Sequence, residues 1–329
     1  MTISEPKPEN GTSTQGRYGK PVSTQLDFLK RFISQPKAVL GLVLLVIFIL
    51  MALLAPLISP YNPNRYVDTP HLAPSSTHWL GTTGQGQDVF SQMVWGARIS
   101  LFIGFSVGIL STLIGLVIGM IAGYIPGLVD GILNLFTNVF LLIPGLPLLI
   151  TLASFLPQGM VTVMLVLTFT GWSWSARVFR SQMLSLREKD FVSASVVSGE
   201  GMPRIVFSEI LPNMLSLVMS SFFGAVIYTI GADAGLAFLG FENVNIVSWG
   251  TMLYWASNSS ALLQEAWWTF LPPGLCIALV SFATTMLIYA MDEVTNPRLR
   301  SEKEIIRMLK KYHISSKRST PVIHEPIVH

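Results

Sequence analysis

Long stretches without a charged side chain dominate this sequence and restrict what it can fold into. Residues 38–58 and 99–129 contain no Asp, Glu, Lys or Arg, and the stretch 131–176 is uncharged over 46 residues. A helix needs roughly 20 apolar residues to cross the hydrocarbon core of a bilayer. Only 12% of the chain is charged, whereas soluble domains are about a quarter charged. The sequence therefore predicts an all-α membrane protein.

Six transmembrane helices are predicted from these stretches. The 46-residue stretch is too long for one crossing, and both "IPGLP" at 143–147 and "LPQG" at 156–159 offer a break; we place it at the second. The first span lacks an A-x-A cleavage pattern and follows 37 residues, so it is interpreted as an uncleaved anchor. The predicted spans are 38–58, 99–124, 131–155, 160–179, 211–232 and 267–291.

The distribution of Lys and Arg predicts the orientation. With both termini cytoplasmic, 19 of the 21 Lys and Arg residues fall in the inner segments 1–37, 177–204 and 298–329, and only Arg65 and Arg98 lie outside. Cytoplasmic segments of membrane proteins carry such an excess. The basic balance is thus explained by topology and contact with the lipid bilayer, and no nucleic-acid partner is predicted.

The predicted organisation has a membrane core between two tails. Residues 1–37 form a largely disordered cytoplasmic N-terminal tail, and residues 297–329 form a basic cytoplasmic tail. After the first span, the external segment 59–97 is rich in proline and ends in a stretch that is predicted to be a helix leading into the second span. The core covers 98–296 and contains a cytoplasmic loop at 185–213 with a short helix between spans four and five.

Small and polar residues inside the spans are candidates for packing or function. Asn134 and Asn138 share one side of span three with Asp130, and either interhelical hydrogen bonds or the lining of a transport pathway would explain them. Asp130 and Asp233 are expected to be caps at the inner and outer surfaces, and Cys276 to be a packing residue. Five glycines in span two predict a close helix contact, within the chain or with a partner subunit: Gly104, Gly108, Gly115, Gly119 and Gly123.

The loop 185–213, "SLREKDFVSASVVSGEGMPRIVFSEILPN", is the longest charged passage inside the apolar part of the chain. Its first part is predicted to be a helix of about 15 residues that ends near Gly199. Phe191, Ser195 and Ser198 share one face of that helix, with Ala194 at its margin. An aromatic ring among small residues suits insertion into a groove of another protein, although a solvated connecting loop would give the same pattern.

This loop resembles the EAA loop of permease subunits of binding-protein-dependent ABC importers. It keeps Ala194, Gly199 and the Ile-Leu-Pro of residues 210–212 at the family spacing, but has Ser193 in place of the Glu and Ser195 in place of the second Ala. "HWLGTTGQGQDVFSQMVWGARISL" at 78–101, together with "LAFLGF", "SWGTML" and "NPRLR", is similar to the second, C-type permease of dipeptide, oligopeptide and nickel importers. The resemblance covers roughly residues 30–300.

The resemblance implies a transport subunit without chemistry of its own. Such a permease pairs with a second, unlike permease, two cytoplasmic ATPases that bind ATP and magnesium, and an external solute-binding protein, in the cytoplasmic membrane of a prokaryote. The solute would be a short peptide, nickel or a related small solute. The residues expected to couple to an ATPase are Arg187, Glu188, Asp190, Phe191, Ser193, Ala194, Ser195, Ser198 and Gly199.

Other functions find less support in the residues. The sequence contains no G-x-x-x-x-G-K-[ST] phosphate loop, and its five histidines avoid the predicted spans, so no catalytic, cofactor or metal site is predicted. The alternative is a stand-alone secondary transporter. That class would be expected to show acidic residues in the middle of spans or an internal repeat, and neither is evident.

Overall fold

The computed structural model describes residues 32–295, and within that range every regular element is helical apart from one isolated bridge between Thr82 and Asp88. The predictions for the two tails fall mainly outside these residues. The helices are α2 (Pro36–Leu53), α3 (Ala55–Ile58), α4 (Val89–Tyr124), α5 (Leu128–Leu142), α6 (Gly145–Phe155), α7 (Met160–Arg187), α8 (Asp190–Val197), α9 (Met202–Arg204), α10 (Leu211–Phe238), α11 (Trp249–Asn258) and α12 (Leu271–Thr295). A π-helical turn, Ile205–Ile210, joins α9 to α10, and a 3₁₀ turn, Trp267–Thr269, precedes α12.

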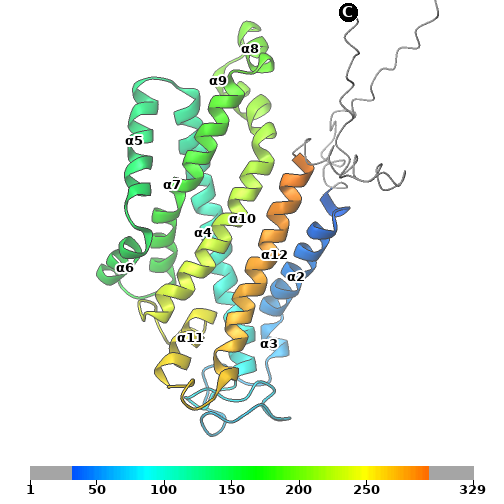
Figure 1. The fold of residues 1–329 in the computed structure, drawn as a ribbon, viewed down its shortest axis with the longest axis vertical. Coiled ribbons are helices and arrows are strands. Elements are labelled where there is room, and N and C mark those ends of the chain that lie inside the picture. Colours follow the sequence, from blue (N-terminus) through cyan, green and yellow to red (C-terminus); the bar gives the residue numbers. More distant parts are fainter. Residues whose placement is uncertain (1–31, 296–329) are drawn as a thin grey trace, which may run out of the picture.

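The long helices lie side by side in one bundle (Figure 1). Helix α4 is central, because it packs against α2, α7 and α10, while α12 packs against α2 and α10. Helices α8 and α9 lie at one end of the bundle, and α11 lies at the other with the non-helical segment 59–88. We refer to these as the α8 end and the α11 end.

Helix α4 is longer than the sequence suggested. Asp88 caps its N-terminus, where the carboxylate accepts a hydrogen bond from Ser91 N at 2.8 Å and another from Ser91 Oγ at 2.7 Å. From there the helix continues for 36 residues, so the helix expected before the second span and the span itself are one element. It ends just before Pro126, whose ring disfavours helical backbone at Ile125.

The glycines of α4 lie against helices of the same chain. A Cβ atom at Gly104 would lie 2.6 Å from Ile230 of α10, and one at Gly108 would lie 2.7 Å from Val226. Gly115, Gly119 and Gly123 face α7, where added Cβ atoms would meet its side chains and backbone at 2.6–2.7 Å. Helix α4 therefore approaches both neighbours more closely than any side chain would allow.

The prediction of a continuous helix over 131–155 is wrong. Helices α5 and α6 are bent by 89° relative to each other, because the chain leaves the helical conformation at Ile143 and Pro144. The predicted break at 156–159 is present as well, since α6 ends at Phe155 and α7 begins at Met160. The 131–176 stretch therefore breaks at both proline sites.

Within residues 32–295, length and apolarity identify four helical segments that could cross a membrane, or five if the bent pair counts as one. They are Pro36–Leu53, Val89–Tyr124, Met202–Phe238, Trp267–Val294 and the pair α5–α6. Helix α7 is 28 residues long but is not among them, because Ser, Trp and Arg interrupt its second half. The protein is a multi-pass membrane protein, and the count of six spans stays a prediction.

Candidate functional site: the α8 end and a side cavity

The segment 185–213 contains the end of α7, the short helices α8 and α9, the π-helical turn and the first residues of α10. The predicted 15-residue helix is wrong, because α7 runs on to Arg187 and the chain turns at Glu188 and Lys189 before α8 begins. Helix α8 has only eight residues. Asp190 lies in its first turn, where a negative charge interacts favourably with the helix dipole. Glu188, Asp190 and Ser193 are exposed to solvent.

One buried valine anchors α8 to the bundle. The Val192 side chain is 2% exposed and packs in a cluster with residues of α4, α7, the π-helical turn and α10, among them Met120, Met183 and Ile205. The rest of the helix is open: Phe191 is 37% exposed, Val196 55% and Val197 88%. Helix α8 is thus anchored through Val192, while its side chains Phe191, Val196 and Val197 remain exposed.

The end of α8 matches a standard helix stop. Gly199 has φ +78°, Gly199 N donates to Val196 O at 3.0 Å, and Glu200 N donates to Ser195 O at 3.1 Å. These two bonds define a Schellman motif, in which glycine is preferred because other residues disfavour positive φ. The hydroxyls of Ser195 and Ser198 bond to backbone carbonyls one turn earlier in α8. Both hydroxyl protons are therefore used within the helix.

Three arginines of α7 tie the α8 end together. Arg187 Nη1 donates to the carbonyls of Gly123 and Tyr124 at 3.3 and 3.2 Å, at the C-terminus of α4 where a cation is favourable. Arg180 forms a two-point ion pair with Asp130 of α5, and Arg177 Nη2 donates to Asn138 Oδ1 at 2.6 Å. The predicted coupling residue Arg187 therefore fixes the α7–α8 junction to α4.

The two asparagines of α5 have different environments. Asn138 is held by Arg177 and thereby joins α5 to α7, whereas Asn134 is half-buried and makes no side-chain hydrogen bond with the described residues. Neither residue lines the large cavity that opens beside α5. Of the two explanations that the sequence left open, an interhelical hydrogen bond applies to Asn138.

That cavity measures about 580 Å³ and lies between α5, the start of α6, α7 and α10. No Asp, Glu, Lys or Arg lines it. Its surface combines small residues and hydroxyls with three aromatic rings: Phe140, Thr170, Gly171, Ser173, Trp174, Ser220, Ser221, Gly224 and Tyr228 contribute to it. The sequence analysis missed these residues, although the run of Ser, Thr and Gly in α7 was a visible signal. The sequence alone does not show that residues of α7 and α10 face the same cavity.

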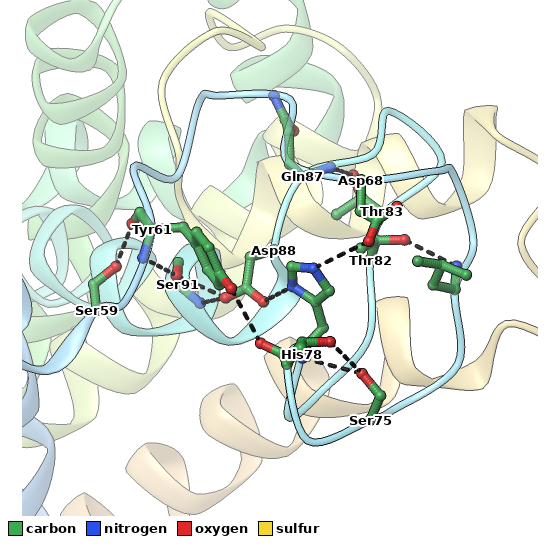
Figure 2. Close-up of polar contacts among 12 residues, drawn as sticks. Ser59, Tyr61, Asp68, Ser75, His78, Thr82, Thr83, Gln87, Asp88 and Ser91 are labelled. Carbon is green, nitrogen blue, oxygen red and sulfur yellow. Dashed lines mark hydrogen bonds and ion pairs between the residues drawn. The ribbon is translucent and has the colours of Figure 1, made fainter.

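At the α11 end, a buried histidine holds the segment 59–88 on the start of α4 (Figure 2). His78 is 4% exposed; its Nδ1 lies 2.9 Å from Asp88 Oδ1, and its Nε2 lies 3.7 Å from Asp68. The ring of Tyr61 packs on the imidazole with centroids 5.1 Å apart. Because Asp88 also caps α4, this network fixes the segment to the longest helix.

Two buried carboxyls lie near the same end. Asp233 is not the expected surface cap, because α10 continues to Phe238 and leaves Asp233 1% exposed inside the fold. Asp233 Oδ1 and both carboxyl oxygens of Glu242 have no hydrogen-bond partner among the described residues, and the two carboxyls interact electrostatically. Burial raises the pKa of Glu242, in the loop after α10, to about 7.

Two family models match this chain. The binding-protein-dependent transport system inner membrane component matches residues 115–301, and the N-terminal TM domain of oligopeptide transport permease C matches residues 24–74. The first match includes α7, α8 and α10, and the second includes α2, α3 and part of the segment 59–88. Together they cover most of the described fold.

Individual proteins agree with these models. The chain is 33% identical over 302 residues to the oligopeptide transport system permease protein OppC of Bacillus subtilis. The alignment covers 90% of this chain and 97% of that protein. It is 33% identical to the dipeptide transport system permease protein DppC of B. subtilis, over 83% of this chain and 86% of that protein. A further DppC, from Alkalihalophilus pseudofirmus, is 32% identical over 85% of this chain and 92% of the relative.

Among solved structures, inward-facing MetNI methionine ABC transporter gives a TM-score of 0.48 at 19% identity, covering 61% of this chain and 96% of that one. The family models and the sequence relatives carry the assignment. The chain belongs to the family of binding-protein-dependent transport system inner membrane components, as the permease component of an ABC importer.

Proposed function

We propose that this chain imports short peptides as one of two unlike permease subunits, and that α8 is the helix on which a cytoplasmic ATPase docks. An ABC importer permease works in general with a partner permease, an ATPase and a solute-binding protein. The relatives named above are permeases of oligopeptide and dipeptide transport systems. Peptides are therefore the solute class that we infer, in preference to nickel.

One observation carries the role of α8. A short helix at the end of the bundle is anchored through Val192 and the turn that Arg187 fixes, while Phe191, Val196 and Val197 remain exposed. Exposed apolar side chains on a rigidly placed helix suit insertion into a groove of another protein. A groove of about 480 Å³ beside α8, bounded by Tyr124 and Pro126, offers a recess for the partner.

The same proposal sets the topology. The four apolar segments, the bent α5–α6 pair and α7 would make six crossings, with α8 and both termini on the cytoplasmic side. The last part of α7 and the segment that follows it carry Arg177, Arg180, Arg187, Lys189 and Arg204, as the positive-inside rule expects of the cytoplasmic side. Segment 59–88 and α11 would then face outward.

The side cavity is proposed as half of the translocation pathway. It opens on a flank of the bundle and is lined by hydroxyl and aromatic groups without a fixed charge. A second permease facing this flank would close it into a channel. A lining without charge would not select for the charge of a peptide side chain, which suits an importer whose selection is made by the solute-binding protein.

ATP hydrolysis would occur on the partner subunits. The sequence has no phosphate-binding loop of the G-x-x-x-x-G-K-[ST] type. ATP and magnesium are therefore assigned to the ATPases. Hydrolysis there would move α8 and thereby shift the permease between two conformations. We expect the purified chain to show no ATPase activity and the assembled complex to hydrolyse ATP. Robust hydrolysis or concentrative uptake by the chain alone would contradict this division.

The test of docking is Val197→Asp. This side chain is 88% exposed, so a charge there leaves the fold intact but opposes burial in an apolar groove. We expect at least a tenfold loss of co-purifying ATPase at normal membrane abundance. Leu263→Asp is the matched control, because Leu263 is 87% exposed and lies between α11 and the 3₁₀ turn that precedes α12. This variant should leave ATPase binding unchanged. Parental ATPase retention and peptide uptake by Val197→Asp would overturn the role of α8.

A further inference from the structure

A polar groove of about 370 Å³ lies at the α11 end, between the segment 59–88, the start of α4 and the residues 244–255. No Asp, Glu, Lys or Arg lines it, and apart from Thr251 its polar side chains belong to Trp255 and to carboxamides. Carboxamides from three parts of the chain meet there: Asn64, Gln85, Gln87, Gln92 and Asn245. Together they line the groove with hydrogen-bonding groups that carry no charge.

Two of these carboxamides form a prearranged wall. Gln92 is buried, and its Nε2 donates to Gln87 Oε1 at 2.6 Å and to the Pro63 carbonyl at 3.1 Å. Gln87 Nε2 in turn donates to the carbonyl of Asn64 at 3.3 Å. Figure 2 shows the Gln87 side chain pointing away from the His78 network, so the hydrogen bonds of Gln87 and Gln92 hold residues 63–64 separately from that network. The wall is therefore set before any ligand arrives.

The other three carboxamides have no partner. The side chains of Asn64, Gln85 and Asn245 make no hydrogen bond with the described residues; only their backbone groups are engaged. A carboxamide offers two N–H donors and one carbonyl acceptor, the same pair of functions that a peptide bond presents. Carboxamides on opposite walls can therefore bind an extended main chain that lies between them.

A second cavity continues the groove toward a cation. It measures about 650 Å³ and shares Asn64, Asn245 and Val247 with the first. It is lined in addition by Trp95 and by Arg98, whose guanidinium lies 5.0 Å from the Trp95 ring centroid. Arg98 is exposed and makes no ion pair with the described residues. We call the two joined cavities the outer trough.

We propose that the outer trough binds a short peptide in extended form, with its main-chain amides on the carboxamides and its C-terminal carboxylate on Arg98. The inference rests on the proposed function as a peptide importer and adds a binding site on the permease itself. An arginine pairs strongly with a carboxylate, and its place at one end of a carboxamide-lined trough matches a chain with a free C-terminus. An internal loop of a protein would offer the amides but no C-terminal main-chain carboxylate.

The experiment uses the full complex in nanodiscs, without the solute-binding protein. The probe is a tripeptide with a central benzoylphenylalanine, which is photo-crosslinked and mapped by mass spectrometry. We expect labelling within 62–64, 85–98 or 244–255. Trialanine should compete about tenfold better than trialanine amide, because only the free acid can pair with Arg98.

Substitutions at Arg98 test the assignment of the carboxylate. Arg98→Gln should make trialanine and its amide compete equally, and Arg98→Lys should keep part of the preference for the acid. Arg65→Gln is the matched control, since Arg65 is an exposed arginine in segment 59–88, at the same end of the bundle, and lines neither cavity. Labelling outside the trough, or an unchanged preference for the acid in Arg98→Gln, would overturn the proposal.

Two further outcomes separate this inference from the function on which it rests. With the solute-binding protein added, uptake of trialanine without any labelling of the trough would leave peptide import standing and reject the trough as a site. If benzoylphenylalanine placed at Gln85 crosslinks to the solute-binding protein and trialanine never competes, the trough holds a loop of that protein and the proposal is wrong. An ATP-hydrolysing complex that imports no peptide would reject the proposed function itself.

Discussion

Arg180 of α7 and Asp130 of α5 form a two-point ion pair, with Nε 2.6 Å from Oδ1 and Nη2 2.8 Å from Oδ2. Both side chains are partly buried, at 27% and 22% exposure. The pair spans the flank that borders the side cavity, together with the Arg177–Asn138 hydrogen bond. It therefore sets how closely α5 approaches α7.

Breaking this pair should loosen α5. Asp130→Asn leaves a partly buried guanidinium without its counter-charge, and we expect a loss of about 1–2 kcal/mol in unfolding free energy. The measurement is thermal unfolding of the purified protein at a fixed scan rate. Glu200→Gln is the control, because the Glu200–Arg204 contact is longer, at 3.4 Å, and Arg204 is 71% exposed. Equal effects of the two substitutions would show that the Asp130 pair is no stronger than a surface contact.

The close packing of α4 on α7 predicts a steric effect. In Gly119→Ala the new Cβ would lie 2.6 Å from Ala176 O and 2.8 Å from Phe179 Cβ, so the helices must separate. We expect a loss of about 2–3 kcal/mol, as for other overpacked sites. Gly131→Ala in α5 is the matched control, since no atom lies within 4 Å of its Cβ and alanine favours helix. The control should be neutral or slightly stabilising, and an equal loss in both variants would contradict the packing argument.

The turn after α8 offers another matched pair of glycines. Gly199 has φ +78° with open space around it, so Gly199→Ala acts through backbone strain alone, at about 1 kcal/mol. Gly201 has φ −73°, and its added Cβ would only touch Pro203 at 3.9 Å. We expect Gly199→Ala to reduce ATPase retention severalfold, because the strain shifts α8, whereas Gly201→Ala should retain parental levels. The proposed coupling role of this turn fails if Gly199→Ala also retains the ATPases fully.

Burial of Glu242 predicts a pH dependence of stability. Its pKa is about 7 in the folded protein against an ordinary value of 4.5, so the folded state holds a proton that the unfolded chain releases between these values. The contribution of Glu242 to the free energy of unfolding is therefore fully present below about pH 4.5. It falls as the pH rises to about 7 and is constant above that pH.

Glu242→Gln removes the group that titrates. At pH 8 the variant should be more stable than the parent by on the order of 1–3 kcal/mol, and at pH 4.5 the two should be similar. The measurement is thermal unfolding at both pH values. Glu265→Gln, at an exposed glutamate of the same end, should not change the pH profile. A stability difference of the same size at both pH values would mean that Glu242 does not cause the pH dependence.

Local sequence information predicted correctly those features whose backbone conformation depends on one residue type. The uncharged stretches predicted helices because every backbone polar group must be satisfied within a lipid-exposed segment. The break at 156–159 and the helix end near Gly199 followed from proline and glycine, whose backbone preferences do not depend on neighbours. The family resemblance to peptide-importer permeases, read from the loop 185–213 and the segment 78–101, is confirmed.

The predictions from sequence were wrong where the conformation of a segment depended on its contacts with other helices. Two proline sites could break the 131–176 stretch, and both did. Helix α6 is bent by 89° relative to α5. The loop helix was expected to continue through Glu188, but Arg187 binds the end of α4 and the chain turns there. Asn134 and Asn138 were chosen for their polarity alone, whereas the cavity is lined by hydroxyls of α7 and α10.

The sequence by itself determined that this is a helical membrane protein, where most of its helices run and to which family it belongs, because apolar length, proline, glycine and motif spacing are properties of consecutive residues. Only the tertiary structure decided which surfaces meet. It placed the glycines of α4 against α7 and α10, left Val197 exposed while burying Val192, and brought Asn64, Arg98 and Asn245 to one trough. These contacts join residues up to 181 positions apart, and their free energy depends on how separate helices pack in three dimensions, which no local pattern records.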